Sequence, residues 1–319
     1  MDPVALCIIF TTSLVLFIAS IVYVRLNFGR CFSKADLSDK TVIITGANTG
    51  IGYYTALDMA NRNARVILAC RNLEKAEHAK KNIIEETDND NVIVKELDLS
   101  SMKSVRKFAN EIIKEEKRLD ILINNAGVVG LPKIITEDGL ESMFATNHFG
   151  PFLLTNLLLD LIKKSCPSRI VNVSSIASKM GRIELDNLRS EKYFNQRRIY
   201  FDSKLANILF TKELARRLKG HDVLVNCLHP GTIQTELLRN LSPFITYPLM
   251  FIGKFFFKNC EEGAQTTIYC AISEEIEDVT GKYFTDCYVD EQSLNKLAHD
   301  ETLTTQLWDI SEKYTGLSQ

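Results

Sequence analysis

From residue 40 onward, short apolar runs rich in β-branched residues alternate with longer stretches of helical spacing. The short runs predict seven strands, at 41–45, 65–69, 92–97, 119–124, 169–174, 222–228 and 282–285. The longer stretches predict helices at 73–86, 102–117, 139–164, 199–219 and 262–273. Nearly continuous apolar strands that alternate with helices are typical of a parallel sheet covered on both faces. The pattern therefore predicts an α/β fold with a doubly wound parallel sheet.

A different pattern precedes this alternation, because residues 4–24 carry no charge. A helix needs about 20 apolar residues to cross the hydrocarbon core of a membrane. The segment lacks the basic start and short apolar core of a secretory signal. We expect an uncleaved transmembrane anchor over residues 1–24, since a buried core helix would rarely lack every charge over this length.

The charges that flank this segment predict its orientation. Arg25, Arg30 and Lys34 follow the span, whereas only Asp2 precedes it. Positive residues stay on the cytoplasmic side, so the rest of the chain should face the cytosol. We divide that remainder into a connector (25–39), one α/β domain (40–290) and a helical tail (291–319).

Composition narrows the function further. The net charge is −2 at neutral pH, and 45% of the residues are hydrophobic. No global basic field exists to hold nucleic acid, so we expect no nucleic-acid partner. The eight cysteines are scattered without a C-x-x-C pair, which indicates reduced packing residues and neither a disulfide framework nor a metal site.

A glycine turn follows the first predicted strand and carries the first chemical signal. The turn reads Gly46-Ala47-Asn48-Thr49-Gly50-Ile51-Gly52, and a helical stretch is expected from Tyr53. Glycines at such a turn let backbone N–H groups approach a pyrophosphate, and the helix N-terminus adds partial positive charge. An ordinary tight turn is the alternative, but the strand before it and the helix after it are the context that a dinucleotide site requires.

The spacing G-x-x-x-G-x-G resembles that of the short-chain dehydrogenase/reductase family, and further ordered motifs carry the same resemblance over residues 38–290. They are Asp98-Leu99, Asn124-Asn125-Ala126-Gly127, Asn147, Ser174-Ser175, Tyr200-x-x-x-Lys204 and Pro230-Gly231-Thr232. The resemblance implies a single-domain Rossmann-type fold. It also implies that the cofactor contacts Gly46, Asn48, Thr49, Gly50, Ile51, Gly52, Arg71, Asn72, Asp98, Leu99, Asn125, Ala126, Gly127, Tyr200, Lys204, Pro230, Gly231 and Thr232.

The spacing of Tyr200 and Lys204 has a physical reason. Residues four apart share one helix face, and a nearby ammonium should lower the pKa of a phenol, which lies near 10. The resemblance implies that Tyr200 exchanges the proton of the substrate oxygen while Lys204 holds the nicotinamide ribose. Ser175 would orient the substrate oxygen, with Ser174 as its rival, and Asn147 would kink its helix and link the lysine to a water chain.

The end of the second predicted strand bears on the choice of cofactor. An acidic residue there would bind the ribose 2′-hydroxyl of NAD, but the sequence reads Ala69-Cys70-Arg71-Asn72. Arg71 can instead pair with a 2′-phosphate, although a solvated surface arginine is the alternative. We therefore expect NADP(H) as the cofactor.

An insertion at 176–199 separates Ser175 from Tyr200 and resembles the retinol dehydrogenase branch of the family, as do Thr45–Gly52, Ala69–Asn72 and Ser203–Thr211. That branch is membrane-anchored and NADP-dependent, and it interconverts retinal and retinol. Asn63, Phe201 and Asp202 depart from the usual pattern without touching the chemistry. We expect a single-pass protein of the endoplasmic reticulum membrane.

Residues 237–257 are rich in Phe, Ile, Leu, Met and Tyr. They either cap an apolar substrate tunnel and touch the bilayer, or form a core helix or a homodimer contact. Retinal, other lipid aldehydes and steroid ketones all suit an apolar mouth. A catalytically idle nucleotide-binding scaffold is a third possibility, but such a protein would be expected to have lost Tyr200 or Lys204.

Overall fold

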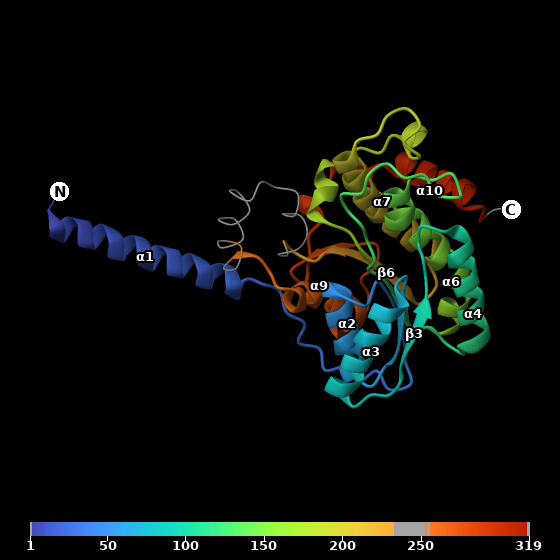
Figure 1. Ribbon diagram of the computed structural model, residues 1–319, viewed down its shortest axis with the longest axis horizontal. Helices are drawn as coiled ribbons and strands as arrows, with labels where there is room; N and C mark the ends of the chain where they lie inside the picture. Colours follow the sequence, from blue (N-terminus) through green and yellow to red (C-terminus); the bar gives the residue numbers. More distant parts are fainter. Residues whose placement is uncertain (1, 233–252, 254–255, 318–319) are drawn as a thin grey trace.

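The computed structural model describes residues 2–232, 253 and 256–317, and its centre is one mixed sheet of eight strands (Figure 1). The strand order is β3-β2-β1-β4-β5-β6-β7-β8, with β8 antiparallel to β7 and all other neighbours parallel. The strands are β1 (Thr41–Thr45), β2 (Arg65–Cys70), β3 (Val92–Glu96), β4 (Ile121–Asn124), β5 (Ser168–Val173), β6 (Val223–His229), β7 (Tyr283–Thr285) and β8 (Tyr288–Val289). The doubly wound parallel sheet is thus confirmed.

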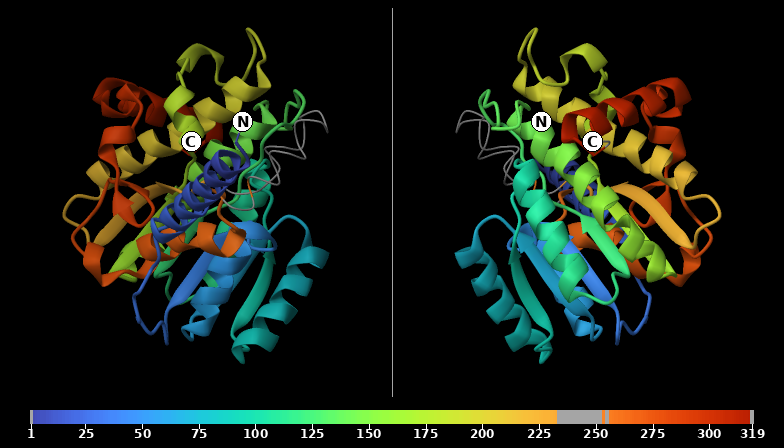
Figure 2. Two further views of the ribbon diagram at one scale, coloured as in Figure 1. Left: turned by 90° about the vertical axis from the view of Figure 1, so that its left-hand side faces the viewer. Right: turned by 90° about the vertical axis from the view of Figure 1, so that its right-hand side faces the viewer.

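Helices cover both faces of this sheet (Figure 2). Side chains of β1 alternate between the two cores: Val42 and Ile44 pack with α2, α3 and α9, whereas Ile43 packs with α4, α6, α7 and α10. The helices are α2 (Gly50–Asn61), α3 (Leu73–Thr87), α4 (Met102–Glu115), α5 (Ser142–Phe144), α6 (Gly150–Lys164), α7 (Gln196–Arg217), α9 (Cys260–Ile272) and α10 (Glu301–Thr315). Short turns are η1 (Ala145–Phe149), η2 (Ile176–Met180), η3 (Leu185–Asn187), η5 (Glu274–Ile276), η6 (Glu291–Ser293) and η7 (Lys296–His299).

The expected helix over 139–164 is wrong in detail. The chain forms the short α5, then a π-helical turn, η1, and only then the regular helix α6. A π turn carries one extra residue per turn, and here it contains Asn147. Periodicity alone does not reveal this insertion, because apolar positions continue on both sides of it. Other helix boundaries also differ by a few residues: α2 begins at Gly50 and not at Tyr53, and α7 begins at Gln196 and not at 199, with Asn195 as its cap.

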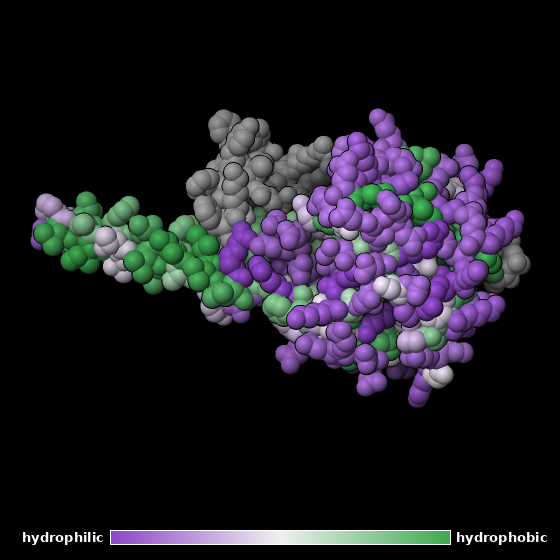
Figure 3. Space-filling model, turned by 90° about the horizontal axis from the view of Figure 1, so that it is seen from below, coloured by the Kyte–Doolittle hydropathy of each residue, from purple (hydrophilic) through white to green (hydrophobic). Residues whose placement is uncertain are grey.

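The N-terminal helix α1 (Pro3–Leu26) projects from the domain and buries none of its residues (Figure 1). It is the one helix in the described part of the chain that is long and apolar enough to cross a membrane. Its surface is apolar along most of its length, in contrast to the mainly hydrophilic domain (Figure 3). A helix that is apolar all round and not buried in protein is suited to lipid, which supports the expected anchor.

The predicted connector and tail both pack on the domain. Leu37, in the connector, is 6% exposed and belongs to the core beneath α2 and α9. Leu307 and Trp308 of α10 are buried in the core on the opposite face, against α6 and α7. The domain limits at residues 40 and 290 stay predictions.

Candidate active site

The predicted site lies along one edge of the sheet, where β1 to β6 end. Parallel strands place their carboxyl ends at the same edge. The strand order reverses between β1 and β4, which are neighbours in the sheet although β2 and β3 separate them in sequence. Ligands of open α/β sheets bind at such a switch point. The topology therefore brings the motifs of all six strands to one edge.

Glycine is required in the turn after β1 for two separate reasons. Gly46 has φ +66°, and a Cβ there would lie 3.0 Å from the Cα of Ala126. Gly52 is required because its neighbours leave no space for a side chain. A Cβ there would lie 2.4 Å from the carbonyl oxygen of Gly46 and 2.5 Å from Nδ2 of Asn125. Atoms at these separations overlap, so side chains are excluded and the turn packs directly on the end of β4.

The start of α2 suits a bound phosphate. Thr49 is the N-cap residue, yet its side chain makes no capping hydrogen bond, and the first turn holds no acidic residue. The first N–H groups of a helix lack partners within the helix, and a phosphate can accept from them. Asn48 and Ile51 are half-buried on either side. This turn therefore fits the diphosphate of a dinucleotide.

Thr45, which is not among the predicted site residues, joins the ends of β1 and β4. Its hydroxyl oxygen accepts from the backbone N–H groups of Asn125 and Ala126, both at 3.0 Å. The side-chain amide of Asn125 donates to the carbonyl of Thr45 at 2.9 Å. Its place directly before Gly46 is the sequence signal that could have identified it.

The ends of β2 and β3 carry the predicted adenosine side of the site. Arg71 is exposed and forms no ion pair within the described residues. Asn72 accepts from the N–H of Lys75 and so caps α3. Asp98 is half-buried, and its carboxylate accepts from the N–H and hydroxyl of Ser100. Leu99 is buried. Among these residues, Arg71 alone presents a free charge.

Asn147 occupies the π turn and is fully buried. Its Oδ1 accepts from the N–H of Val128 at 2.8 Å, and its Nδ2 donates to the carbonyl of Val128 and to Oγ of Ser203. The helix around Asn147 thus departs from regular α-geometry as a π turn, while the expected link to a water chain stays a prediction. A Cβ on Gly127 would lie 3.1 Å from Nζ of Lys204 and 3.5 Å from Oδ1 of Asn147. The fold thus gathers these three predicted residues around one point.

The structure distinguishes the two serines after β5. The Ser174 hydroxyl is buried and donates to the backbone carbonyl of Lys204 at 2.7 Å, so it holds α7 against the strand. Ser175 is half-buried, and its hydroxyl acts on the Tyr200 phenol so as to lower the pKa of that phenol. Ser175 also caps η2 by accepting from the N–H of Ala177. The geometry therefore favours Ser175 for the substrate oxygen.

Burial has opposite effects on the proton affinities of Tyr200 and Lys204. Desolvation raises the pKa of the Tyr200 phenol, and the hydrogen bond with Ser175 opposes this only in part. The expected lowering of the Tyr200 pKa by Lys204 is not found in the cofactor-free protein. The ammonium lies 5.9 Å from the tyrosine ring centroid and donates to the carbonyl of Val173 at 3.1 Å. Burial lowers the pKa of Lys204 to about 8.

The loop after β6 completes the edge. Pro230 is buried, Gly231 is half-buried with φ +95°, and Thr232 is exposed. The N–H of Gly231 donates to Nδ1 of His229 at 3.0 Å. Residues 233–252, 254 and 255, which include most of the predicted apolar segment 237–257, lie outside the described residues.

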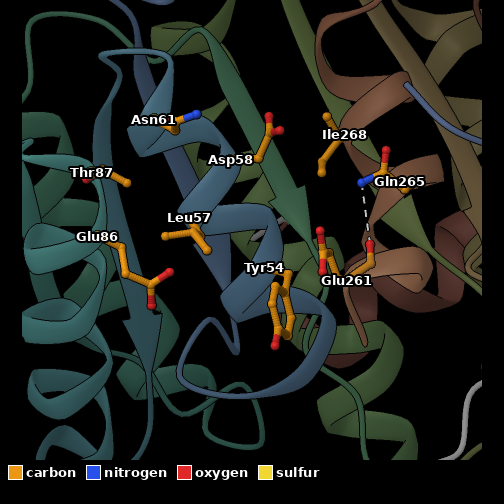
Figure 4. Close-up of a pocket in the computed structure, with 9 residues that line it drawn as sticks. All are labelled: Tyr54, Leu57, Asp58, Asn61, Glu86, Thr87, Glu261, Gln265 and Ile268. Carbon is orange, nitrogen blue, oxygen red and sulfur yellow. Dashed lines mark hydrogen bonds between the residues drawn. The ribbon is translucent and has the colours of Figure 1, made fainter. Parts of the chain in front are cut away.

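A hollow of about 380 Å³ opens elsewhere, between α2, the end of α3 and α9 (Figure 4). Its wall includes the carboxylates of Asp58, Glu86 and Glu261, and no residue of the predicted site. Carboxylates repel an anionic nucleotide. This hollow is therefore not the place where a dinucleotide binds.

A glycine turn at the switch point, a Tyr-x-x-x-Lys helix and a serine whose hydroxyl acts on that tyrosine are the features expected of a dehydrogenase site. The chain belongs to the short-chain dehydrogenase family, which its sequence matches over residues 40–245. It is accordingly an oxidoreductase of the alcohol dehydrogenase class with a fold that binds a nicotinamide nucleotide.

Individual relatives agree with this class. The chain is 49% identical over 292 residues to human "Retinol dehydrogenase 11", covering 92% of this chain and 91% of the relative. It is 50% identical over 291 residues to mouse "Retinol dehydrogenase 14", covering 87% and 86%. A crystal structure of a Mycobacterium paratuberculosis protein has a TM-score of 0.71 at 34% identity, covering 88% and 94%. A Shigella flexneri short-chain dehydrogenase complexed with NADP has a TM-score of 0.63 at 25% identity, covering 80% and 99%.

Proposed function

We propose that this protein is a membrane-anchored, NADP(H)-dependent oxidoreductase that interconverts an apolar aldehyde and its alcohol, with retinal and retinol as the substrate pair. The observation that carries the proposal is the convergence of Ser175, Tyr200, Lys204 and Asn147 beside the glycine turn. Relatives named retinol dehydrogenases, about half identical over nine-tenths of the chain, support the retinoid substrate.

The chain's residues divide the work of aldehyde reduction as follows. The nicotinamide, when bound, supplies the hydride to the carbonyl carbon. Ser175 donates a hydrogen bond that orients the carbonyl oxygen, and the Tyr200 hydroxyl gives that oxygen its proton. The phenol is protonated at neutral pH and therefore has this proton to give, although burial raises its pKa. Lys204, held by the Val173 carbonyl, orients the ribose side of the cofactor.

Apolar side chains beside the catalytic serine support an apolar substrate. Ile176 directly follows Ser175 and is 47% exposed, and Met180, one turn further on, is 58% exposed. Val129, just after the Gly127 turn, is also exposed. Exposed apolar side chains that gather beside polar catalytic groups are typical of sites for apolar ligands.

A substrate panel tests the proposed reaction. Retinal, a medium-chain aldehyde, a long-chain lipid aldehyde and a steroid ketone are compared by kcat/KM in detergent, each with NADPH and with NADH. We expect retinal with NADPH to give the highest value. A higher value for the lipid aldehyde or the steroid ketone would move the proposal to that substrate. Absence of turnover with all four would indicate the scaffold alternative.

We further propose that the anchor lies in the endoplasmic reticulum membrane with the domain in the cytosol. Arg25, Arg30 and Lys34 directly after α1 support this orientation. The chain has two N-x-S/T sequons. Asn172 is buried in β5, where its side chain is hydrogen-bonded to Asn124 and Thr211, whereas Asn240 lies outside the described residues.

Protease added to intact microsomes tests this orientation. The domain should be digested, and the protein should carry no glycan. A shift in mass on endoglycosidase treatment that Asn240→Gln abolishes would place the domain in the lumen instead.

A further inference from the structure

The loop after β6, at the predicted nicotinamide end of the site, packs against Lys258. The backbone N–H of Lys258 donates to the carbonyl of Thr232 at 3.0 Å. Its side chain fills the space that a Cβ on Gly231 would need, because that atom would lie 2.7 Å from Cδ of Lys258. Lys258 therefore contacts both Gly231 and Thr232, through its side chain and its backbone respectively.

The charge of Lys258 is held inside the protein. The residue is 2% exposed, and a buried ammonium needs a partner. That partner is the carboxylate of Asp286, in the tight turn between β7 and β8 where Asp286 and Cys287 both have positive φ. The ion pair thus fastens the β6 loop to the β7–β8 turn.

The same turn receives the residues that follow the membrane helix. The N–H of Gly29 donates to the Asp286 carboxylate at 3.4 Å. A Cβ on Gly29 would lie 2.0 Å from the backbone oxygen of Asp286. The connector is therefore in backbone contact with the turn, and this contact tolerates no side chain at residue 29.

Phe28 and Arg25 add a second contact between the anchor and this region. Nζ of Lys258 lies 5.3 Å from the centroid of the Phe28 ring, within the range of a cation–π interaction. Arg25, in the last turn of α1, pairs with Glu262 at the start of α9 at 2.6 Å. Figure 1 shows the end of α1 beside the chain that leads into α9.

We propose that Lys258 is a positioning residue that holds the Gly231–Thr232 loop for cofactor binding and joins it to the juxtamembrane residues Phe28 and Gly29. The proposal rests on the proposed function only in taking this loop as part of the nicotinamide site. The buried ion pair between Lys258 and Asp286 then has two roles. It positions the Gly231–Thr232 loop, and it fixes the orientation of the domain relative to its anchor.

The full-length protein in detergent and in phosphatidylcholine vesicles tests the first part. Lys258→Met keeps the chain length and removes the charge. We expect it to weaken NADPH affinity, followed by NADPH fluorescence, by about tenfold, because removing one member of a buried pair displaces what the pair positions. Hydrogen exchange in residues 227–232 should accelerate, while kcat at saturating cofactor stays within about twofold.

Lys40→Met is the control at a distant ion pair. Lys40 pairs with Asp120 at 3.1 Å, directly before β1 and thus at the opposite edge of the sheet, and its side chain is more exposed than that of Lys258. It should leave both NADPH affinity and exchange at 227–232 unchanged. If Lys258→Met binds NADPH as the wild type does, with the same exchange at 227–232, the positioning role is wrong even if the melting temperature falls.

The link to the membrane end has its own test. Phe28→Leu and Gly29→Ala should accelerate exchange at 227–232 as Lys258→Met does, whereas Phe32→Leu should not, because Phe32 is 83% exposed. Unchanged exchange at 227–232 in both connector variants would overturn the link. Each comparison is repeated with NADH, so a wrong cofactor assignment is distinguishable from a wrong role for Lys258.

Discussion

The two halves of the sheet build their parts of the site in different ways. In the half containing β1 to β3, the site consists of backbone and exposed side chains: a crowded glycine turn, an uncapped helix start and the exposed Arg71. In the half containing β4 to β6, it consists largely of buried polar side chains, such as Asn147 and Lys204, which are at most 4% exposed.

This difference teaches how binding and chemistry are separated in one domain. Backbone N–H groups can hold a phosphate near solvent at little cost, because water can satisfy them when the ligand is absent. The buried groups of the second half have perturbed pKa values: burial raises the pKa of Tyr200 and lowers that of Lys204 to about 8. Substitutions in the first half should therefore change cofactor binding, and those in the second half should change turnover.

The largest effect should come from Tyr200→Phe. The phenyl ring keeps its space, and only the transferable proton is lost, so kcat should fall by about 10²–10⁴ while NADPH affinity stays near wild type. Tyr54→Phe, in the hollow of Figure 4 and outside the site, serves as the control. Activity of Tyr200→Phe within threefold of wild type would show that another group supplies the proton.

Alanine substitutions at two glycines of the first half should differ in their effects on cofactor binding and stability. Gly52→Ala places a Cβ 2.4 Å from the Gly46 carbonyl oxygen, so the turn must open. We expect at least about tenfold weaker cofactor binding and about 1–3 kcal/mol lower stability. At Gly50 a Cβ meets no atom within 4 Å, but φ is +60°, so Gly50→Ala should cost only about 1–2 kcal/mol of backbone strain.

Chemical denaturation and NADPH titration of both glycine variants measure this contrast. Unchanged NADPH affinity in Gly52→Ala would mean that the crowding at Gly52 does not shape the phosphate turn.

Arg71→Asp should change the choice of cofactor without affecting stability. It removes the proposed partner of the 2′-phosphate and puts a like charge beside it, so the ratio of kcat/KM for NADPH over NADH should fall roughly tenfold to a hundredfold. Lys75→Asp, on the exposed first turn of α3, is the matched charge control. An unchanged ratio in Arg71→Asp would mean that another residue recognises the phosphate.

The last expected effect is on stability against pH in the cofactor-free protein. Burial lowers the pKa of Lys204 from 10.5 to about 8. Between these values the folded state binds fewer protons than the unfolded state, so the Lys204 contribution to stability should increase with pH. The stability of wild type minus that of Lys204→Met should therefore rise from pH 8 to pH 10. A flat difference would mean that Lys204 is not desolvated.

The comparison of the two halves also separates what could be predicted from what could not. The strands, most of the helices and the motif at each strand end follow from the local pattern of residues, and so does the apolar α1. Lys204 and Tyr200 could be paired from their spacing, because four residues on a helix place two side chains on one face. The glycine turn could be recognised from seven consecutive residues, although the crowding that excludes side chains at Gly46 and Gly52 comes partly from Ala126 and Asn125 at the end of β4.

The tertiary structure decided the rest, because those features depend on residues distant in sequence. The sign of the Tyr200 pKa shift depends on burial by packed neighbours, which no spacing expresses. Ser174 and Ser175 are neighbours in sequence, and they differ through the groups that packing brings to each, such as the Lys204 carbonyl that Ser174 contacts. The role proposed for Lys258 needs Gly231 and Asp286 at once. Local sequence thus determined which groups are present at the sheet edge, and long-range packing determined how exposed, charged and fixed each of them is.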